Sequence, residues 1–117
     1  MNDNRITGNL GESYAARLLK KKGYKIIAKN FRSRYGEIDI IAKDGETYVF
    51  IEVKTRNSEK YGKPEEAVTP TKLVHIKTTA EYFLIKNNIL SRNMRIEVVA
   101  ISFDKNIGLT TKVINVV

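Results

Sequence analysis

The amino-acid sequence predicts an α/β fold: a mixed five-stranded central sheet flanked by helices, with the elements in the order α-β-β-β-α-β-β. Three observations lead to this expectation. Apolar residues recur at helical spacing in two segments, near residues 7–22 and 70–88. Five shorter segments alternate apolar with polar side chains or are rich in β-branched residues, as strands are. The chain of 117 residues is the size of one domain, so we expect a single domain over residues 1–117.

Glycines separate the elements expected in the first half of the chain. The first helix is expected over residues 7–22, and Gly23 provides its C-terminal stop. Residues 24–31 alternate in polarity and predict a strand. Two further strands are expected over residues 35–42 and 47–55, joined at Asp44-Gly45, which is a strong hairpin signal.

The second half is expected to contain one helix and two strands. Residues 56–68 have turn formers and charge but little apolar periodicity, so we expect a loop there. Thr69 is a good N-cap, and Pro70 suits the first position of a helix that continues to about residue 88. The last two strands are expected over residues 95–103 and 112–117.

The net charge of +8 indicates the class of partner. A small domain with this charge attracts polyanions, and nucleic acid is the commonest of them, although excess lysine can also serve solubility alone. A membrane partner is not expected: no apolar run approaches the ~20 residues that span a bilayer, and no amphipathic helix has a basic face on one side that would bind a membrane surface. The chain has no cysteine, which excludes disulfides and thiolate zinc sites and fits a cytoplasmic location.

Four charged side chains interrupt the two strands that flank the Asp-Gly turn. Glu37 and Asp39 alternate along one strand, and Glu52 and Lys54 alternate along the next. If Asp44-Gly45 is a two-residue loop, Glu37 is opposite Glu52 and Asp39 is diagonal to it, so all four share one face of the sheet. A three-residue loop would place the two pairs on opposite faces.

Three carboxylates on one half-buried face are unfavourable by several kcal/mol unless a cation joins them. A hard divalent ion such as Mg²⁺ or Mn²⁺ would supply that compensation through oxygen ligands. Lys54 could then hold a water molecule or offset charge on a phosphate. The alternative is a solvated sheet face on which glutamate and lysine side chains pair.

Asp39, followed after twelve residues by Glu52-Val53-Lys54, resembles the D…ExK core of the PD-(D/E)XK nuclease superfamily. Further residues in the same order resemble the YraN-like bacterial endonuclease-like family, which is similar to the archaeal Holliday junction resolvases. These residues are Gly8, Gly11-Glu12, Ala15, Leu19, Gly23-Tyr24, Asn30, residues 36–41 and 50–56, and Lys72. Glu97 is a departure, since an aspartate is expected there.

The resemblance implies a restriction-endonuclease-like fold, a divalent metal ion, and nucleic acid as the partner, with DNA favoured over RNA. It implies that Asp39, Glu52 and Glu12 are metal ligands and that Lys54 is catalytic. Glu37 is expected to support the metal, or to be a surface charge. An alternative for Glu12 is a helix capping box that begins at Asn9.

Basic residues around this site suit contacts with phosphates, which position a nucleic acid without reading its sequence. Each of them could instead be a solvated charge. They are Arg32, Arg34, Arg56, Lys60, Lys63 and, by the resemblance, Lys72. We expect His75 to be structural or on the surface, and Tyr82 and Phe83 to pack in the core rather than stack on bases.

The function expected from these features is a Mg²⁺-dependent endonuclease-type phosphodiesterase acting on DNA, including branched or structured DNA. One alternative is a non-catalytic nucleic-acid-binding module that retains the fold, and another is an interaction domain with a vestigial acidic cluster. The intact D…ExK spacing favours the enzyme, because a phosphate-binding surface gains nothing from carboxylates. Symmetrical cutting of two strands would favour a homodimer.

Overall fold

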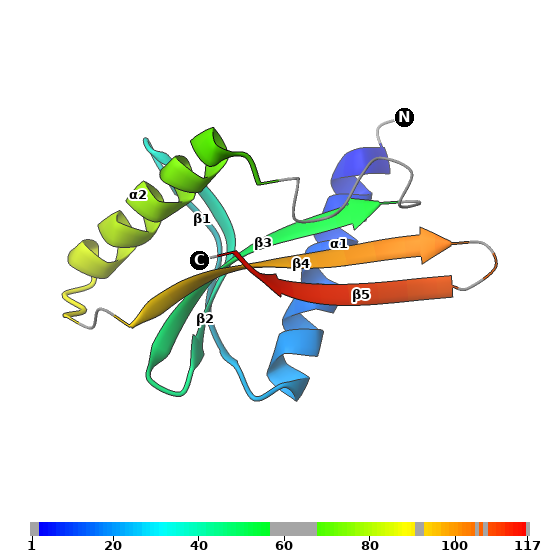
Figure 1. The fold of residues 1–117 in the computed structure, drawn as a ribbon, viewed down its shortest axis with the longest axis horizontal. Coiled ribbons are helices and arrows are strands. Elements are labelled where there is room, and N and C mark those ends of the chain that lie inside the picture. The colour runs from blue at the N-terminus through cyan, green and yellow to red at the C-terminus, as the bar shows by residue number, and fades with distance from the viewer. Residues whose placement is uncertain (1–2, 57–67, 91–92, 105, 107, 117) are drawn as a thin grey trace.

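The computed structural model describes residues 3–56, 68–90, 93–104, 106 and 108–116, and it contains two helices and five strands in these ranges (Figure 1). The elements are α1 (Asp3–Lys21), β1 (Lys25–Ser33), β2 (Gly36–Asp44), β3 (Thr47–Arg56), α2 (Pro70–Lys86), β4 (Met94–Asp104) and β5 (Gly108–Asn115). The predicted order α-β-β-β-α-β-β is confirmed.

The five strands form one mixed sheet whose spatial order follows the chain, β1-β2-β3-β4-β5. The neighbours β1–β2, β2–β3 and β4–β5 are antiparallel, whereas β3 and β4 are parallel. A parallel pair needs a crossover connection, and the segment that contains α2 provides it. The mixed sheet is therefore also confirmed.

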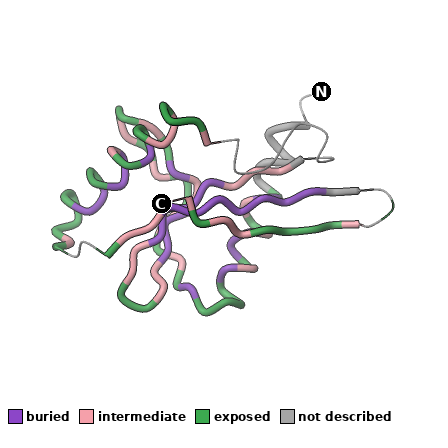
Figure 2. Tube along the Cα trace, viewed as in Figure 1, coloured by how far each residue is buried: buried purple, intermediate pink, exposed green. Residues whose placement is uncertain are grey.

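Each helix covers its own apolar cluster. The α1-side cluster joins Leu19 of α1 to sheet residues that include Ile40, Val49 and Ile51. The α2-side cluster joins Ile76, Ala80, Phe83 and Leu84 of α2 to Ile38, Ile41, Phe50 and Ile96. Figure 2 shows the central strands buried along much of their length, while α2 is buried on one side only.

The β2–β3 turn differs from the predicted turn. Asp44 pairs with Thr47, so the two-residue loop is Gly45-Glu46 rather than Asp44-Gly45. Gly45 has φ +60° at the first central position, as a type II′ hairpin requires. Asp44 stays in the strand because its carboxylate accepts a 2.7 Å hydrogen bond from Arg95 on β4.

The corrected turn moves the register by two residues and preserves which face each side chain occupies. Ile40 pairs with Ile51, so the expected pairing of Glu37 opposite Glu52, with Asp39 diagonal to it, is wrong. Asp39 and Glu52 follow this last pair on their strands, and they line the same pocket.

Some boundaries also differ from those predicted. α1 begins at Asp3 rather than near residue 7, and β5 begins at Gly108 rather than near residue 112. The threonines of β5 lack apolar alternation, but backbone pairing with β4 extends the strand through them. A β-bulge between Ile26 and Ala28 interrupts the alternation of β1. Within the described ranges, neither helix has the length and apolar character needed to cross a bilayer.

Candidate active site

Asp39 lies where β2 separates from β3. Regular pairing of the two strands ends at Ile40 and Ile51. Ile38 packs in the α2-side cluster and Ile40 in the α1-side cluster, so the backbone rotates between them. Asp39 Oδ2 accepts a hydrogen bond of 2.8 Å from the Val53 amide. This bond ties Asp39 to β3 beyond the end of the regular pairing.

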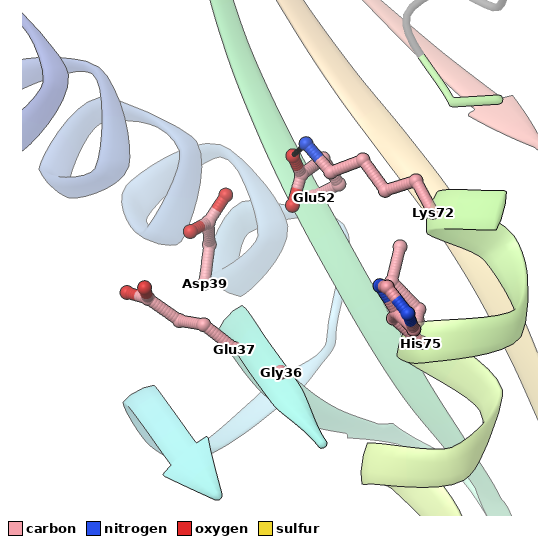
Figure 3. Close-up of a pocket in the computed structure, with 7 residues that line it drawn as sticks. Gly36, Glu37, Asp39, Glu52, Lys72 and His75 are labelled. Carbon is pink, nitrogen blue, oxygen red and sulfur yellow. Dashed lines mark ion pairs between the residues drawn. The ribbon is translucent and has the colours of Figure 1, made fainter. Parts of the chain in front are cut away.

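Glu52 is the most buried carboxylate of the site, with 8% of the residue exposed. It follows Phe50 along the face of β3 that meets α2. The ammonium of Lys72, from the first turn of α2, forms an ion pair with Glu52 Oε2 (Figure 3), and Lys54 Nζ lies 3.4 Å from the same oxygen. Burial lowers the pKa of Lys72, but Glu52 more than offsets this and holds the amine in its charged form.

The contact between α1 and β3 directs Glu12 toward the site. This contact is made by the preceding residue, Gly11, which packs against Thr55 of β3. A Cβ atom on Gly11 would lie only 2.3 Å from Thr55 Cγ2, so no larger residue fits this contact. Burial raises the pKa of Glu12, a hydrogen bond with Asn30 opposes the rise, and the charges of Glu37 and Glu52 add to it. The capping-box alternative for Glu12 is wrong, because α1 begins at Asp3 and Glu12 lies well inside the helix.

The charge on Asp39 is poorly compensated. Burial, together with the neighbouring Glu52, raises the pKa of Asp39 to about 7, and the Val53 hydrogen bond only partly opposes the rise. Glu12 contributes in the same direction as Glu52. An acidic group in this state gains from any cation that can reach it.

A pocket of about 270 Å³ opens between β2, β3 and α2, as Figure 3 shows. α2 forms one wall because Gly36, at φ +153°, lets it approach: a Cβ there would lie 3.1 Å from Thr79 Oγ1 and 3.5 Å from His75 Cβ. The lining residues are Gly36, Glu37, Asp39, Glu52, Lys72, His75 and Ile76.

Two residues of this region were not assigned to the site from the sequence. His75 was expected to be structural or on the surface, and it is an exposed residue that also lines the pocket. The sequence feature that could have identified His75 is its position three residues after Lys72, which places both side chains on the same side of the helix. Asn30 bonds to Glu12 from the middle of β1, where its φ of +53° is unusual for a strand residue.

Among the described residues, the basic side chains expected to contact phosphates have different partners. Arg32 is exposed and lies 3.5 Å from Glu37, and Arg34 donates a 3.0 Å hydrogen bond to the hydroxyl of Tyr35. Lys72 forms an ion pair with Glu52. Arg56 belongs to β3. Lys60 and Lys63 lie outside the described residues.

The donor chemistry of the pocket fits a hard divalent ion. Asp39 and Glu52 are adjacent carboxylates, and the raised pKa of Asp39 marks negative charge that a cation would relieve. Across residues 3–56, 68–90 and the remaining described positions, no three metal-ligating side chains form a ready cluster. Mg²⁺ commonly binds through one or two carboxylates and keeps several waters, so two protein ligands are sufficient for it.

The fold and the pocket define a small basic α/β protein with a carboxylate-lined pocket between β2, β3 and α2. Residues 11–101 match the model of the uncharacterised protein family UPF0102, and the chain belongs to this family. It is 49% identical over 102 residues to a UPF0102 protein of Syntrophus aciditrophicus, which covers 87% of this chain and 80% of the relative. It is 50% identical over 97 residues to a UPF0102 protein of Caldicellulosiruptor saccharolyticus, with 83% and 82% covered.

Another relative, UPF0102 protein GSU0650 of Geobacter sulfurreducens, is 48% identical over 99 residues, or 85% of this chain and 77% of the relative. The YraN-like family that the sequence resembles is thereby supported at the level of UPF0102. Glu12, Asp39, Glu52, Lys54 and Lys72 all lie within the segment that matches the family model.

Proposed function

We propose that the protein is a Mg²⁺- or Mn²⁺-dependent endonuclease-type phosphodiesterase that acts on DNA and belongs to the PD-(D/E)XK superfamily, with a restriction-endonuclease-like fold. The observation that carries the proposal is the placing of Asp39 and Glu52 in one pocket of a chain of net charge +8, with the charge of Glu12 acting on Asp39 from α1. A basic protein that only bound phosphates would gain nothing from carboxylates at such a point.

In this proposal, Asp39 and Glu52 would hold the metal ion, and Glu12 of α1 and Glu37 of β2 would support them. The bound ion supplies Lewis acidity: it polarises the scissile phosphate and lowers the pKa of an attacking water. Lys54 orients that water and offsets the negative charge that develops on the phosphate. The Val53 amide keeps Asp39 turned toward β3 throughout.

Lys72 has two successive partners in the proposed cycle. Without metal it neutralises Glu52. A divalent ion held by Asp39 and Glu52 would compete with Lys72 for Glu52, and the Lys72 ammonium would then be available to a substrate phosphate. Because Lys72 lies in the first turn of α2, its backbone would stay in place and only its side chain would move in such a change of partner.

A second candidate function is a non-catalytic nucleic-acid-binding module. The ion pairs of Glu52 with Lys54 and Lys72 favour it, because they already neutralise Glu52 with protein charges. The two functions differ in what a metal does. The enzyme requires a divalent ion for turnover, whereas the binding module binds nucleic acid equally well in chelator.

The deciding experiment is a cleavage assay over branched, nicked, single-stranded and duplex DNA and matching RNA, with Mg²⁺, Mn²⁺ or chelator. We expect metal-dependent cleavage of at least one DNA substrate, lost by at least a hundredfold in Asp39→Asn, Glu52→Gln and Lys54→Met. Glu81→Gln, an equal charge change on the exposed side of α2, is the matched control. Binding without cleavage under every metal condition would select the binding module instead.

A further inference from the structure

An exposed pair of aromatic rings lies next to the acidic pocket. Tyr35, in the β1–β2 turn, and Tyr82, on α2, have ring centroids 5.9 Å apart and an interplanar angle of 58°. They are 37% and 38% exposed, and with Ser33 and Arg34 they line a pocket of about 370 Å³. The expectation that Tyr82 packs in the core is therefore wrong, while Phe83 beside it is buried as expected.

The outer rings rest on a rigid base. Phe31 of β1 lies behind Tyr82 with ring centroids 6.2 Å apart, and it meets Phe83 edge-on at 5.2 Å. Phe83 in turn packs edge-on against Phe50 in the middle of the sheet. Because this stack holds the Tyr82 ring in place, a flat ligand on its exposed face would find the ring already ordered.

Two cations accompany the rings. The Arg34 guanidinium lies 5.1 Å from the centre of the Tyr35 ring, and Lys86 Nζ lies 5.9 Å from the centre of the Tyr82 ring. Arg34 and Lys86 are both exposed. Aromatic faces with adjacent cations are the combination that single-stranded nucleic acids use: bases stack on the rings and phosphates meet the charges.

Each tyrosine of the ring pair is close to a residue that lines the acidic pocket. Tyr35 directly precedes Gly36, which lines the acidic pocket. On α2, Tyr82 follows the pocket residue His75 by seven positions, which is two helical turns, about 10 Å along the same side of the helix. The rings therefore lie about two helical turns along α2 from the pocket residue His75, so that one strand can contact both the pocket and the rings.

We propose that Tyr35 and Tyr82 form a stacking platform for an unpaired nucleobase, so that the substrate carries a single-stranded segment next to the scissile phosphate. This inference rests on the proposed nuclease function and names its substrate class. A base in a duplex cannot reach the rings, because both of its faces are stacked. The two rings are tilted by 58° to each other and do not form a parallel slot, so the base would lie on their exposed faces.

The test measures binding in chelator, so that cleavage plays no part. Fluorescence anisotropy would compare a short labelled single strand with a blunt duplex of the same length, each as DNA and as RNA. Tyr82→Ala and Tyr35→Ala should each weaken single-strand binding by about fivefold or more and leave duplex binding within about twofold. Tyr82→Phe keeps the ring and should bind as the wild type does.

Tyr48→Ala is the matched control. Tyr48 also has a cation over its ring, because Lys43 Nζ lies 5.3 Å from the ring centre. It is on β3, opposite the end of β2 that is far from Tyr35. The variant should leave the preference for single strands unchanged. Thermal unfolding of each variant confirms that it is folded before binding is compared.

A second measurement needs no variant. The fluorescence of a single strand that contains 2-aminopurine should decrease on binding to the wild-type protein, because stacking quenches the emission of this base. Absence of quenching, or alanine variants that bind single strands as tightly as the wild type, would overturn the platform. Quenching without cleavage under any metal condition leaves the platform standing and removes the nuclease function, whereas cleavage with unaffected tyrosine variants does the reverse.

Discussion

At the scale of single residues, Asp39 links the chemistry of the pocket to the stability of the protein. Its pKa is raised in the folded state to about 7, from an ordinary value of 3.8. The folded protein therefore binds more protons than the unfolded chain between these two values. By linkage, the free energy of unfolding must fall as the pH rises through this window.

We therefore predict that wild-type stability in chelator falls between about pH 4 and pH 7, with a slope of at most about 1.4 kcal/mol for each unit of pH. Asp39→Asn cannot ionise and should remove most of this fall. Urea denaturation across the pH range measures both proteins. Parallel curves for wild type and Asp39→Asn would show that the Asp39 carboxylate ionises as freely in the folded chain as in the unfolded one.

The same pocket predicts opposite effects of two substitutions on metal binding. Asp39→Asn removes a proposed ligand and should reduce Mn²⁺ affinity by at least tenfold. Lys72→Met removes the ammonium that competes for Glu52 and should increase Mn²⁺ affinity several-fold. Isothermal titration calorimetry measures both, with Glu81→Gln as the control. Weaker Mn²⁺ binding in Lys72→Met would contradict the competition between this amine and a metal.

At the scale of elements, the contact between α1 and β3 positions Glu12. Gly11→Ala should destabilise the protein by about 1–3 kcal/mol, because the new methyl group overlaps Thr55 Cγ2. The double variant with Thr55→Ser lacks that Cγ2 atom and should recover most of the loss. Helix propensity alone predicts the opposite sign, since alanine favours a helix over glycine by about 1 kcal/mol. Urea denaturation that shows a more stable Gly11→Ala variant would therefore refute the close contact.

The elements themselves could largely be predicted from local patterns. Periodicity found both helices and all five strands, and charges within apolar strands singled out Asp39, Glu52 and Lys54. The turn was displaced by one residue because its position depends on the Arg95–Asp44 bond, a contact between distant segments. The Lys72–Glu52 ion pair and the exposure of Tyr82 likewise depend on how distant segments pack together. Spacing along the chain carries no information about such contacts.

At the scale of the whole molecule, an acidic pocket lies within a strongly basic chain. In the proposed function, the net charge of +8 would attract the nucleic-acid backbone, and the carboxylates would repel it unless a cation were bound. Binding that depends on phosphates releases counterions, so the affinity must decrease steeply with salt.

We predict that the logarithm of the binding constant falls linearly with the logarithm of salt concentration. Arg34→Gln should reduce the slope by about 0.7 for a single strand, the contribution of one phosphate contact. Lys20→Gln, which removes an exposed charge near the C-terminal end of α1, should leave the slope unchanged. Anisotropy titrations over a range of salt concentrations give both slopes. A salt-independent affinity would exclude phosphate contacts as the main source of binding.

The linear strand order also has a consequence for how the protein folds. β2 and β3 are joined by a two-residue turn, so Asp39 and Glu52 can meet as soon as one local hairpin closes. Isolated hairpins form within about 1–10 μs, whereas the parallel β3–β4 pair must wait for the long crossover through α2. We therefore expect the two carboxylates to come together, with Lys54 beside them, before Lys72 reaches Glu52. We therefore expect a species in which the β2–β3 hairpin has formed but α2 has not docked to be stabilised by divalent cations more than the native protein is. In the native protein, Lys72 of α2 already pairs with Glu52.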